Sequence, residues 1–248
     1  MYLVDYHTHP YSHGEIDVKN INYLKQFIER AEAINVMEMG FTDHDMFIDK
    51  INWDNYIYLK KETNFKLKLG LEFDYKPGEE EKIKKIKDKL PLDYCIGSVH
   101  FIDDWPFDHP DYQNEYLKRD LNRVYLDYFH LLRQAVESNL FDIVGHFDLI
   151  KVFNFIPENI NIIELVTPVL KAIKKKDMVI EINTNGLNKP VNEIYPSLTI
   201  LRAAYKMDIP VTFGSDAHFP ARVGEGIAAV SSMIKKIGYK RIATFDKK

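Results

Sequence analysis

The sequence predicts an α/β fold in which parallel strands form a closed or partly closed β/α barrel, with an open doubly wound sheet as the alternative. Short apolar runs alternate with longer amphipathic stretches along the whole chain, as in repeated βα units. Several runs are nearly continuous in Val, Ile, Leu and Phe, which is typical of strands covered on both faces. The length of 248 residues suits one such barrel, so we expect a single domain spanning residues 1–248.

The expected elements follow this alternation from one end of the chain to the other. Seven apolar runs predict strands at residues 2–5, 36–41, 67–73, 93–99, 141–145, 178–183 and 209–214. Stretches with apolar residues at helical spacing and charges on one face predict helices at about 18–34, 52–63, 79–89, 113–137, 158–175 and 195–207, with another after 221. The lysine-rich stretches at 82–89 and 171–177 are interpreted as solvated helix faces and not as nucleic-acid contacts.

Composition excludes several classes of partner. Lys and Arg total 33 against 37 Asp and Glu, a net charge of −4, which argues against a broad basic surface for nucleic acid or an anionic membrane. No apolar run approaches the ~20 residues that span a bilayer, and the first residues lack a signal core, so we expect a cytoplasmic protein. The single cysteine, Cys95, lies in an apolar strand and is expected to be a buried packing residue. The sequence leaves the oligomeric state open.

Most histidines of the chain come just after a predicted strand. Of the nine in the chain, six come just after a predicted strand: His7 and His9 after the first, His44 after the second, His100 after the fourth, His146 after the fifth and His218 after the seventh. The third strand carries Glu72 near its end instead, and Asp43 and Asp216 accompany two of the histidines. The carboxyl ends of the strands of a parallel barrel open on one face. These side chains should therefore converge there.

This set of side chains predicts a metal centre. A single histidine is more often a structural residue, but a structural role does not explain six histidines that all come just after a strand. The His-x-His pair directs both imidazoles to one side of its strand. Imidazole and carboxylate without thiolate suit Zn²⁺, Fe²⁺ or Mn²⁺, and the ligands outnumber what one tetrahedral ion uses. We therefore expect a multinuclear site. His109 and His130 fit no such pattern and are expected to be structural.

The motifs HTH, TDHD, GLEF, GSVH, GH and SDAH occur in this order over almost the whole chain. This order resembles the polymerase-and-histidinol-phosphatase (PHP) family, and within it the stand-alone histidinol-phosphatases. The segments DYHTHPYSHG, VGHFDL, EINTNG followed by EIYPS, and GSDAH strengthen the second likeness. The resemblance implies a distorted (β/α)₇ TIM-like barrel that holds three divalent transition-metal ions: zinc, iron or manganese.

The family pattern also implies how the ligands are shared. The first metal takes His7, His9, Glu72 and Asp216; Glu72 bridges to a second metal held by His100 and His146; and the third takes His13, His44 and His218. His13 lies in a loop, and a structural role remains its alternative. For Glu72 the alternative is an exposed charge. Asp43 is expected to orient a histidine without itself touching a metal, and binding to the third metal through water is its alternative.

The activity implied by the resemblance is hydrolysis of L-histidinol phosphate in histidine biosynthesis. A hydroxide between the first two metals would attack phosphorus in line, the third metal would hold phosphate oxygens, and Asp216 would shuttle the proton. Glu72, Asp216 and His218 are thus the expected catalytic residues. A phosphotyrosine-protein phosphatase, a 3′-to-5′ exonuclease and a non-catalytic metal-binding module are the alternatives; negative net charge and the lack of a second domain disfavour the exonuclease.

Substrate contacts are expected from charged and aromatic residues around the rim of the barrel. The candidates are Arg222 and Lys189 for phosphate, Asn183 or Asn185 for a polar contact, Trp105 at the mouth, and Asp103, Asp104 or Asp108 for a cationic amine. Family members often carry an arginine where this chain has Asn188. Lys189 would then supply a point charge in place of a bidentate fork.

Overall fold

The computed structural model describes residues 1–14 and 20–245, and it confirms all seven predicted strands. They form one parallel sheet in the order β1-β2-β3-β4-β7-β8-β9, which follows the chain without reversal. The strands are β1 (Val4–Asp5), β2 (Glu38–Phe41), β3 (Lys66–Asp74), β4 (Tyr94–Ser98), β7 (Ile143–Val144), β8 (Val179–Asn183) and β9 (Val211–Gly214). A doubly wound sheet would reverse its strand order at a switch point, so this topology excludes that alternative.

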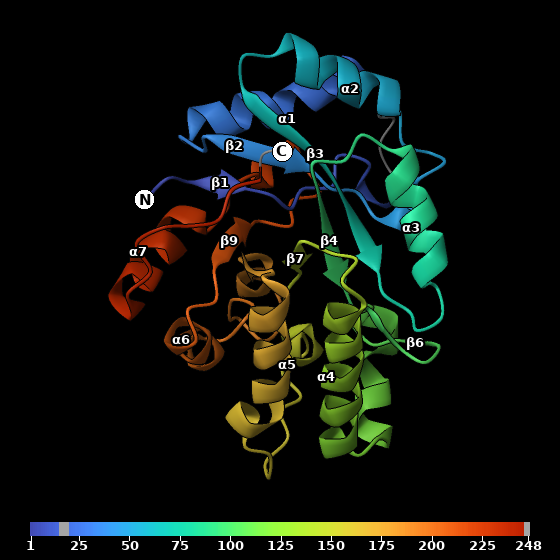
Figure 1. Ribbon diagram of the computed structural model, residues 1–248, viewed down its shortest axis with the longest axis vertical. Coiled ribbons are helices and arrows are strands. Elements are labelled where there is room, and N and C mark those ends of the chain that lie inside the picture. The colour runs from blue at the N-terminus through green and yellow to red at the C-terminus, as the bar shows by residue number, and fades with distance from the viewer. Residues whose placement is uncertain (15–19, 246–248) are drawn as a thin grey trace.

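The sheet curls until its first and last strands meet. Beside β1, the backbone N–H of Tyr6 donates to the carbonyl of Phe213 at 2.9 Å, and that of His9 donates to Ala217 at 2.8 Å. Together with an isolated parallel bridge between Thr8 and Ala217, these bonds bring the ends of β1 and β9 together. The result is a nearly closed seven-stranded barrel with helices around it (Figure 1), and because neighbouring strands are parallel their carboxyl ends lie on one face of the barrel.

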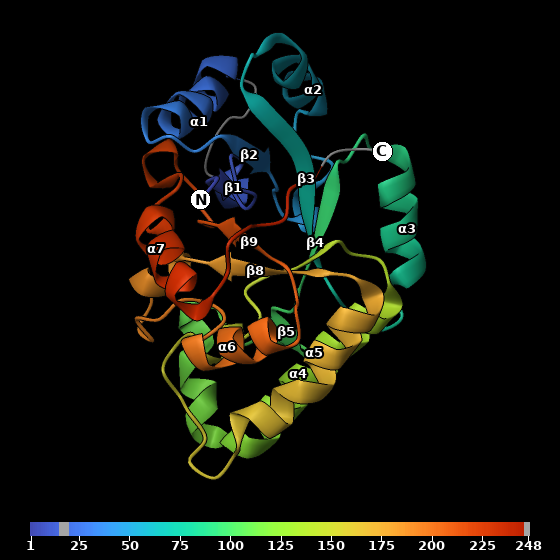
Figure 2. The same cartoon turned by 60° about the vertical axis from the view of Figure 1, so that its left-hand side comes forward.

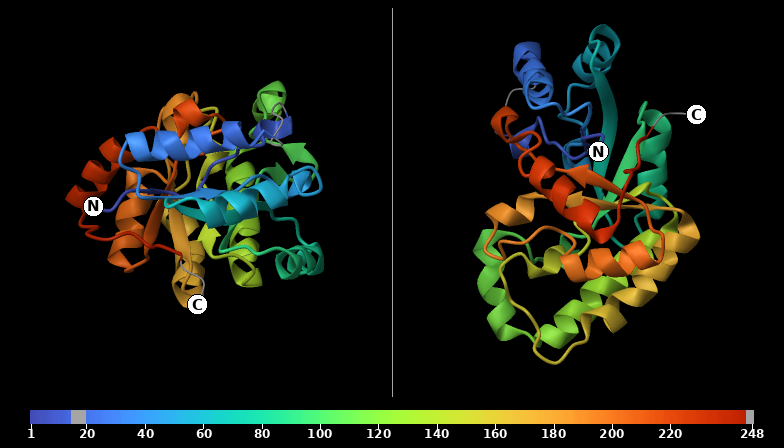
Figure 3. Two further views of the ribbon diagram at one scale, coloured as in Figure 1. Left: turned by 90° about the horizontal axis from the view of Figure 1, so that it is seen from above. Right: turned by 90° about the vertical axis from the view of Figure 1, so that its left-hand side faces the viewer.

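Helices surround the strands, as the sequence predicts. They are α1 (Ile21–Ala33), α2 (Trp53–Glu62), α3 (Glu80–Lys89), α4 (Leu121–Ser138), α5 (Ile162–Lys176), α6 (Leu198–Lys206) and α7 (Ile227–Ile237). Helices α1 and α2 cover β2 and β3, whereas α4, α5 and α6 lie on the opposite side of the barrel (Figures 2 and 3). Residues 18 and 19 of the first expected helix lie outside the described residues. None of the described helices is long and apolar enough to cross a membrane.

The single helix predicted over 113–137 is wrong. A 3₁₀ helix at Pro110–Lys118 precedes α4, and the backbone at Arg119 and Asp120 between them is extended. The carboxylate of Asp120 accepts from the backbone N–H of Asn122 at 2.9 Å, so this residue is the N-cap of a new helix. A short hairpin, β5 (Phe101–Ile102) with β6 (Trp105–Pro106), was also not predicted, because two-residue strands carry no periodicity.

The amino end of the barrel is filled by aromatic rings. The rings of Tyr6, Tyr94 and Phe245 contact one another with centroids 5.2–5.3 Å apart. The hydroxyl of Tyr94 crosses the interior and donates to the carbonyl of Tyr6 at 2.6 Å. A Cβ atom at Gly40 would collide with that hydroxyl, so this strand position has to be glycine for the ring to fit. Packing therefore closes this end, and the polar residues gather at the other.

Candidate metal centre

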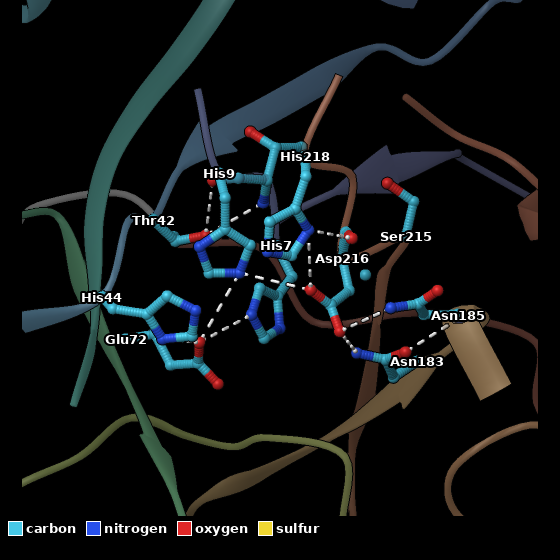
Figure 4. A network of polar contacts seen from close by, with 12 residues as sticks. His7, His9, Thr42, His44, Glu72, Asn183, Asn185, Ser215, Asp216 and His218 are labelled. Carbon is cyan, nitrogen blue, oxygen red and sulfur yellow. Dashed lines mark hydrogen bonds and ion pairs between the residues drawn. The ribbon is translucent and has the colours of Figure 1, made fainter. Parts of the chain in front are cut away.

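Glu72 lies within the histidine cluster at the carboxyl end of the barrel, and Figure 4 shows its carboxylate facing His7, His9 and His44. Its Oε2 is 3.0 Å from His44 Nδ1 and 3.3 Å from His7 Nε2. Its Oε1 is 2.9 Å from His146 Nε2 and 3.5 Å from His100 Nε2. Glu72 is 1% exposed, so it is not the surface charge that was the alternative. One carboxylate thus contacts histidines from four strands, the geometry that a bridging ligand needs.

The cluster divides into three overlapping groups whose ligand atoms lie within 4.8 Å of one another. These groups are His7, His9 and Glu72; His44, Glu72 and His100; and His9, His44 and His218. His146 joins the second group, because its Nε2 lies 3.2 Å from that of His100. The exposed ring of His13 stacks on His218 at 4.4 Å and on His44 at 5.1 Å. All the predicted ligands except Asp216 meet in these contacts.

Asp216 completes the set through a left-handed backbone conformation (φ 55°) just beyond β9. Its Oδ1 lies 3.3 Å from His9 Nε2, and its Oδ2 accepts from the side-chain amides of Asn185 (3.1 Å) and Asn183 (3.4 Å). The guanidinium of Arg222 donates in turn to Asn185 Oδ1 at 3.0 Å. Asn183 and Arg222 therefore support Asp216 and Asn185, and neither is among the described residues that line the cavity.

Several buried ring nitrogens in this cluster have no hydrogen-bond partner among the described residues. They are Nε2 of His7, Nδ1 of His146, Nε2 of His218 and both nitrogens of His9. Buried polar atoms are normally paired, and a group of unpaired imidazole nitrogens around carboxylates offers the lone pairs that a metal centre needs. The donor set therefore fits divalent transition metals.

The electrostatics favour the protonation states that metal ligands need at Glu72, Asp216 and His9. Burial would lower the pKa of His7 and that of His100, but Glu181 and Glu72 hold the pKa of His7 well above its usual range, and Glu72 raises that of His100 to about 10. Burial would raise the pKa of Glu72, but the surrounding histidines, His7 first among them, hold it well below its usual range. Burial would likewise raise the pKa of Asp216, and His7 and His9 outweigh it. The pKa of His9 lies well below normal because of burial and of neighbouring histidines. Ionised carboxylates and neutral imidazole are the forms that bind cations.

Two contacts at the site differ from the sequence expectation or were missed. Asp43 was expected to orient a histidine; its carboxylate instead accepts from the backbone N–H of Tyr11 at 2.8 Å and from the hydroxyl of Tyr56 at 2.5 Å. It thereby anchors the segment between His9 and His13. Glu181, which is not one of the predicted site residues, contacts His7 Nδ1 at 2.6 Å. The signal in the sequence that could have identified Glu181 is its position as the one acidic residue in the apolar run MVIEIN.

A cavity of about 110 Å³ opens over the cluster. Besides metal-ligand candidates, its lining contains Asp108, Leu149, Val152, Asn185, Lys189 and Tyr195. Lys189, for which a phosphate contact is predicted, thus lines the cavity, whereas Asn188 is exposed and donates to Glu225 at 3.0 Å.

The prediction that Trp105 lines the mouth is wrong. Its ring is buried, with its centroid 4.8 Å from that of Tyr116, and the Arg119 guanidinium lies 4.3 Å from it. Asp103 and Asp104 are exposed in the turn of the β5–β6 hairpin. Neither they nor Trp105 are among the described lining residues. His109 and His130 are exposed and lie outside that lining.

Comparison with known families gives the cluster its context. The PHP domain model matches residues 5–185, and a PHP-associated model matches residues 199–235. The chain belongs to the PHP family.

Curated PHP relatives are named as histidinol-phosphatases. A probable histidinol-phosphatase of Deinococcus radiodurans is 38% identical over 177 residues, which cover 71% of this chain and 66% of that protein, just under two thirds of its length. The histidinol-phosphatase of Bacillus subtilis is 29% identical, covering 88% of this chain and 93% of its own. That of Lactococcus lactis is 25% identical and covers 99% and 95%.

Solved structures share the fold of this PHP protein. The histidinol phosphate phosphatase of Lactococcus lactis, solved in complex with zinc, L-histidinol and phosphate, superposes with a TM-score of 0.77. The two chains are 23% identical, and the superposition covers 99% of each. This similarity confirms the barrel predicted from the sequence.

Proposed function

We propose that this PHP protein is a metal-dependent phosphatase that hydrolyses L-histidinol phosphate to L-histidinol and phosphate. One observation carries the proposal: the same small cavity joins the histidine and carboxylate cluster to Lys189, to the acid Asp108 and to an apolar wall of Leu149 and Val152. Such a cavity is suited to a phosphate at one end and an amine with a heteroaromatic ring at the other. The names of the curated relatives support the same substrate.

We assign the three predicted metal positions to the ligand sets expected from the sequence, and propose zinc, iron or manganese as the ions. Glu72 would be shared between the first two positions, since each of its oxygens contacts histidines from different strands. His218 would bind through Nε2, because its Nδ1 lies 3.1 Å from the carbonyl of Asp216 and donates to it. Divalent ions held there would neutralise phosphate charge and activate water at neutral pH.

The residues of the chain would orient the substrate and move the proton. The carboxylate of Asp216 is ionised, and its Oδ2 is fixed by Asn183 and Asn185 while Oδ1 faces the cluster. It is thus placed to accept a proton from water and to pass it to the leaving alkoxide. The ammonium group of Lys189 would add positive charge for the phosphate.

Asp108 is the acid that we propose for recognition of the substrate amine. Of the three acids considered from the sequence, it alone is among the lining residues that the structure describes. A charge-assisted hydrogen bond from an ammonium group to this carboxylate would strengthen binding by about 10- to 100-fold over a phosphate ester without the amine.

Substrate preference tests this assignment directly. The metal-loaded protein should show a higher kcat/KM for L-histidinol phosphate than for p-nitrophenyl phosphate, a phosphotyrosine peptide or a single-stranded oligonucleotide. A preference for the peptide or the oligonucleotide would show that the proposed substrate is wrong, but it would not contradict the proposed metal centre. Absence of turnover with all four would instead favour a metal-binding module without catalysis.

The Asp108→Asn variant sharpens the same experiment. We expect KM for L-histidinol phosphate to rise about 10- to 100-fold, with little change for p-nitrophenyl phosphate, which has no amine. Asp104→Asn, in the exposed hairpin turn, is the matched control and should resemble the wild type. An equal effect of Asp108→Asn on both substrates would assign this residue a role other than amine recognition.

A further inference from the structure

Glu181 connects three strands beneath the cluster without being one of the predicted ligands. It lies on β8, is 1% exposed, and brings its Oε1 to 2.6 Å from Nδ1 of His7, which follows β1. Its Oε2 accepts from the backbone N–H of His146, after β7, at 2.7 Å. The side-chain amide of Asn183 donates to the same oxygen at 3.3 Å. One buried carboxylate thus fixes parts of two ligand positions at once.

The neighbouring strand is shaped to let this side chain pass. Strand β9 lies between β8 and the start of β1, and it ends in Gly214. A Cβ atom at position 214 would collide with Oε1 of Glu181 and would lie 2.6 Å from the Cβ of His7. Any larger residue would therefore separate the carboxylate from the imidazole. Only glycine is compatible with this contact.

The contact determines which nitrogen of His7 carries the proton. An ionised carboxylate only accepts hydrogen bonds, so Nδ1 of His7 must donate to it. In the neutral ring, Nε2 then has a free lone pair, and this atom is the buried one that lacks a hydrogen-bond partner and lies 3.3 Å from Glu72. A carboxylate behind a metal-binding imidazole fixes the tautomer and makes the ligand more basic.

We propose that Glu181 is a positioning residue of the metal centre: it holds His7 in the Nδ1–H tautomer, aims Nε2 at the metal and fixes the backbone of His146. This inference rests on the metal centre proposed above. Glu181 does not touch the substrate in this role. Its loss should therefore change metal retention first, and turnover as a consequence.

Glu181→Gln keeps the shape of the side chain and removes its charge. The amide oxygen can still accept from His7, but the amide NH₂ then faces the N–H of His146, so one of these donors is left unpaired. We expect metal retention against a competing chelator to weaken by about 10- to 100-fold. Mass spectrometry of bound metal after dialysis measures this loss without relying on activity.

Glu38→Gln is the matched control. Glu38 is also a buried barrel carboxylate, but its side chain bonds to the hydroxyls of Tyr2 and Tyr6 and to Lys66, at the amino end. Its substitution should leave metal retention unchanged. Nitrogen-15 NMR of the zinc-loaded protein adds a second readout: His7 should be the Nδ1–H tautomer in the wild type and should lose this preference in Glu181→Gln.

The possible outcomes distinguish a failure of the proposed metal centre from a failure of the proposed role of Glu181. If the wild type retains no metal, the metal centre itself is wrong. If the wild type retains metal and Glu181→Gln retains it equally, with an unchanged His7 tautomer, the role of Glu181 is wrong. If Glu181→Gln does not fold, Glu181→Asp tests the role of Glu181 instead. This variant keeps the negative charge but moves the carboxylate away from His7 and His146 by the length of one methylene group. We expect a smaller loss in the same direction, and wild-type retention would overturn the inference.

Discussion

The two ends of the barrel each bury a glutamate, and their surroundings differ in one respect. Glu38, on β2 at the amino end, accepts from the hydroxyls of Tyr2 and Tyr6 and pairs with the Lys66 ammonium at 3.1 Å. Glu72, on β3 at the carboxyl end, is surrounded by imidazoles, several of whose nitrogens have no hydrogen-bond partner among the described residues. The first network is complete within the protein. The second needs something else to complete it.

This difference separates a structural network from a binding site. A buried polar group with all its hydrogen bonds satisfied stabilises the fold, whereas unpaired buried groups cost free energy unless a ligand pairs with them. The amino end combines its satisfied carboxylate with rings packed across Gly40. The carboxyl end instead carries the cavity. Substitutions at the two ends should therefore have separable effects on stability and on metal binding.

The largest effect is expected at Glu72. Glu72→Gln removes the charge that all the surrounding histidines share, so kcat should fall by at least ~10³-fold, and Asp216→Asn should act in the same way. His13→Asn should be milder, because His13 is exposed and joins the cluster only by ring stacking. Steady-state kinetics with measured metal content checks this order. Near-normal kcat in a metal-replete Glu72→Gln protein would remove its bridging role.

Metal removal should come second. Ions bound at a hundredfold excess over their Kd stabilise the native state by about 2.7 kcal/mol, which corresponds to roughly 5–10 °C in Tm for a chain of this size. Thermal unfolding before and after chelation measures the shift, and adding metal back should reverse it. The shift should shrink in Glu72→Gln and persist in Glu38→Gln. The same Tm with and without metal would argue against ions bound in the folded cluster.

A smaller effect, on stability alone, is expected at the amino end. Gly40→Ala forces a methyl group against the Tyr94 hydroxyl and should lower the free energy of unfolding by ~1–3 kcal/mol without reducing metal content. Chemical denaturation measures this loss. In the double variant with Tyr94→Phe, which removes the hydroxyl, part of the cost of Gly40→Ala should disappear. Strictly additive losses would mean that the two residues do not compete for the same space.

The smallest effect concerns Cys95, next to Tyr94 on β4. Burial raises the pKa of its thiol to about 12, so almost no thiolate exists near neutral pH. We expect no reaction of the native protein with a disulfide reagent at about pH 8, and one equivalent of reaction after unfolding. Fast reaction of the native protein would show that this part of the barrel opens readily.

The sequence alone indicated much of this architecture, because the relevant signals are local. Apolar runs such as MVIEIN and amphipathic stretches between them have a period that depends on neighbouring residues only, and all seven strands were found in this way. The histidines that follow five of the seven strands also predicted convergence, since parallel strands share one carboxyl end. The assignment of each residue to a particular ion stays a prediction.

Contacts between distant strands were decided by the tertiary structure. Glu181 reaches His7 across 174 positions of the chain, and only the closure of β9 against β1 brings the two together. The same closure explains Gly214, whose lack of a side chain has no local signature. Trp105 was misplaced for a related reason: its distance from His100 in sequence is short, but the hairpin packs its ring on Tyr116. Periodicity specifies which face a residue occupies, whereas the partner on that face depends on how the barrel closes.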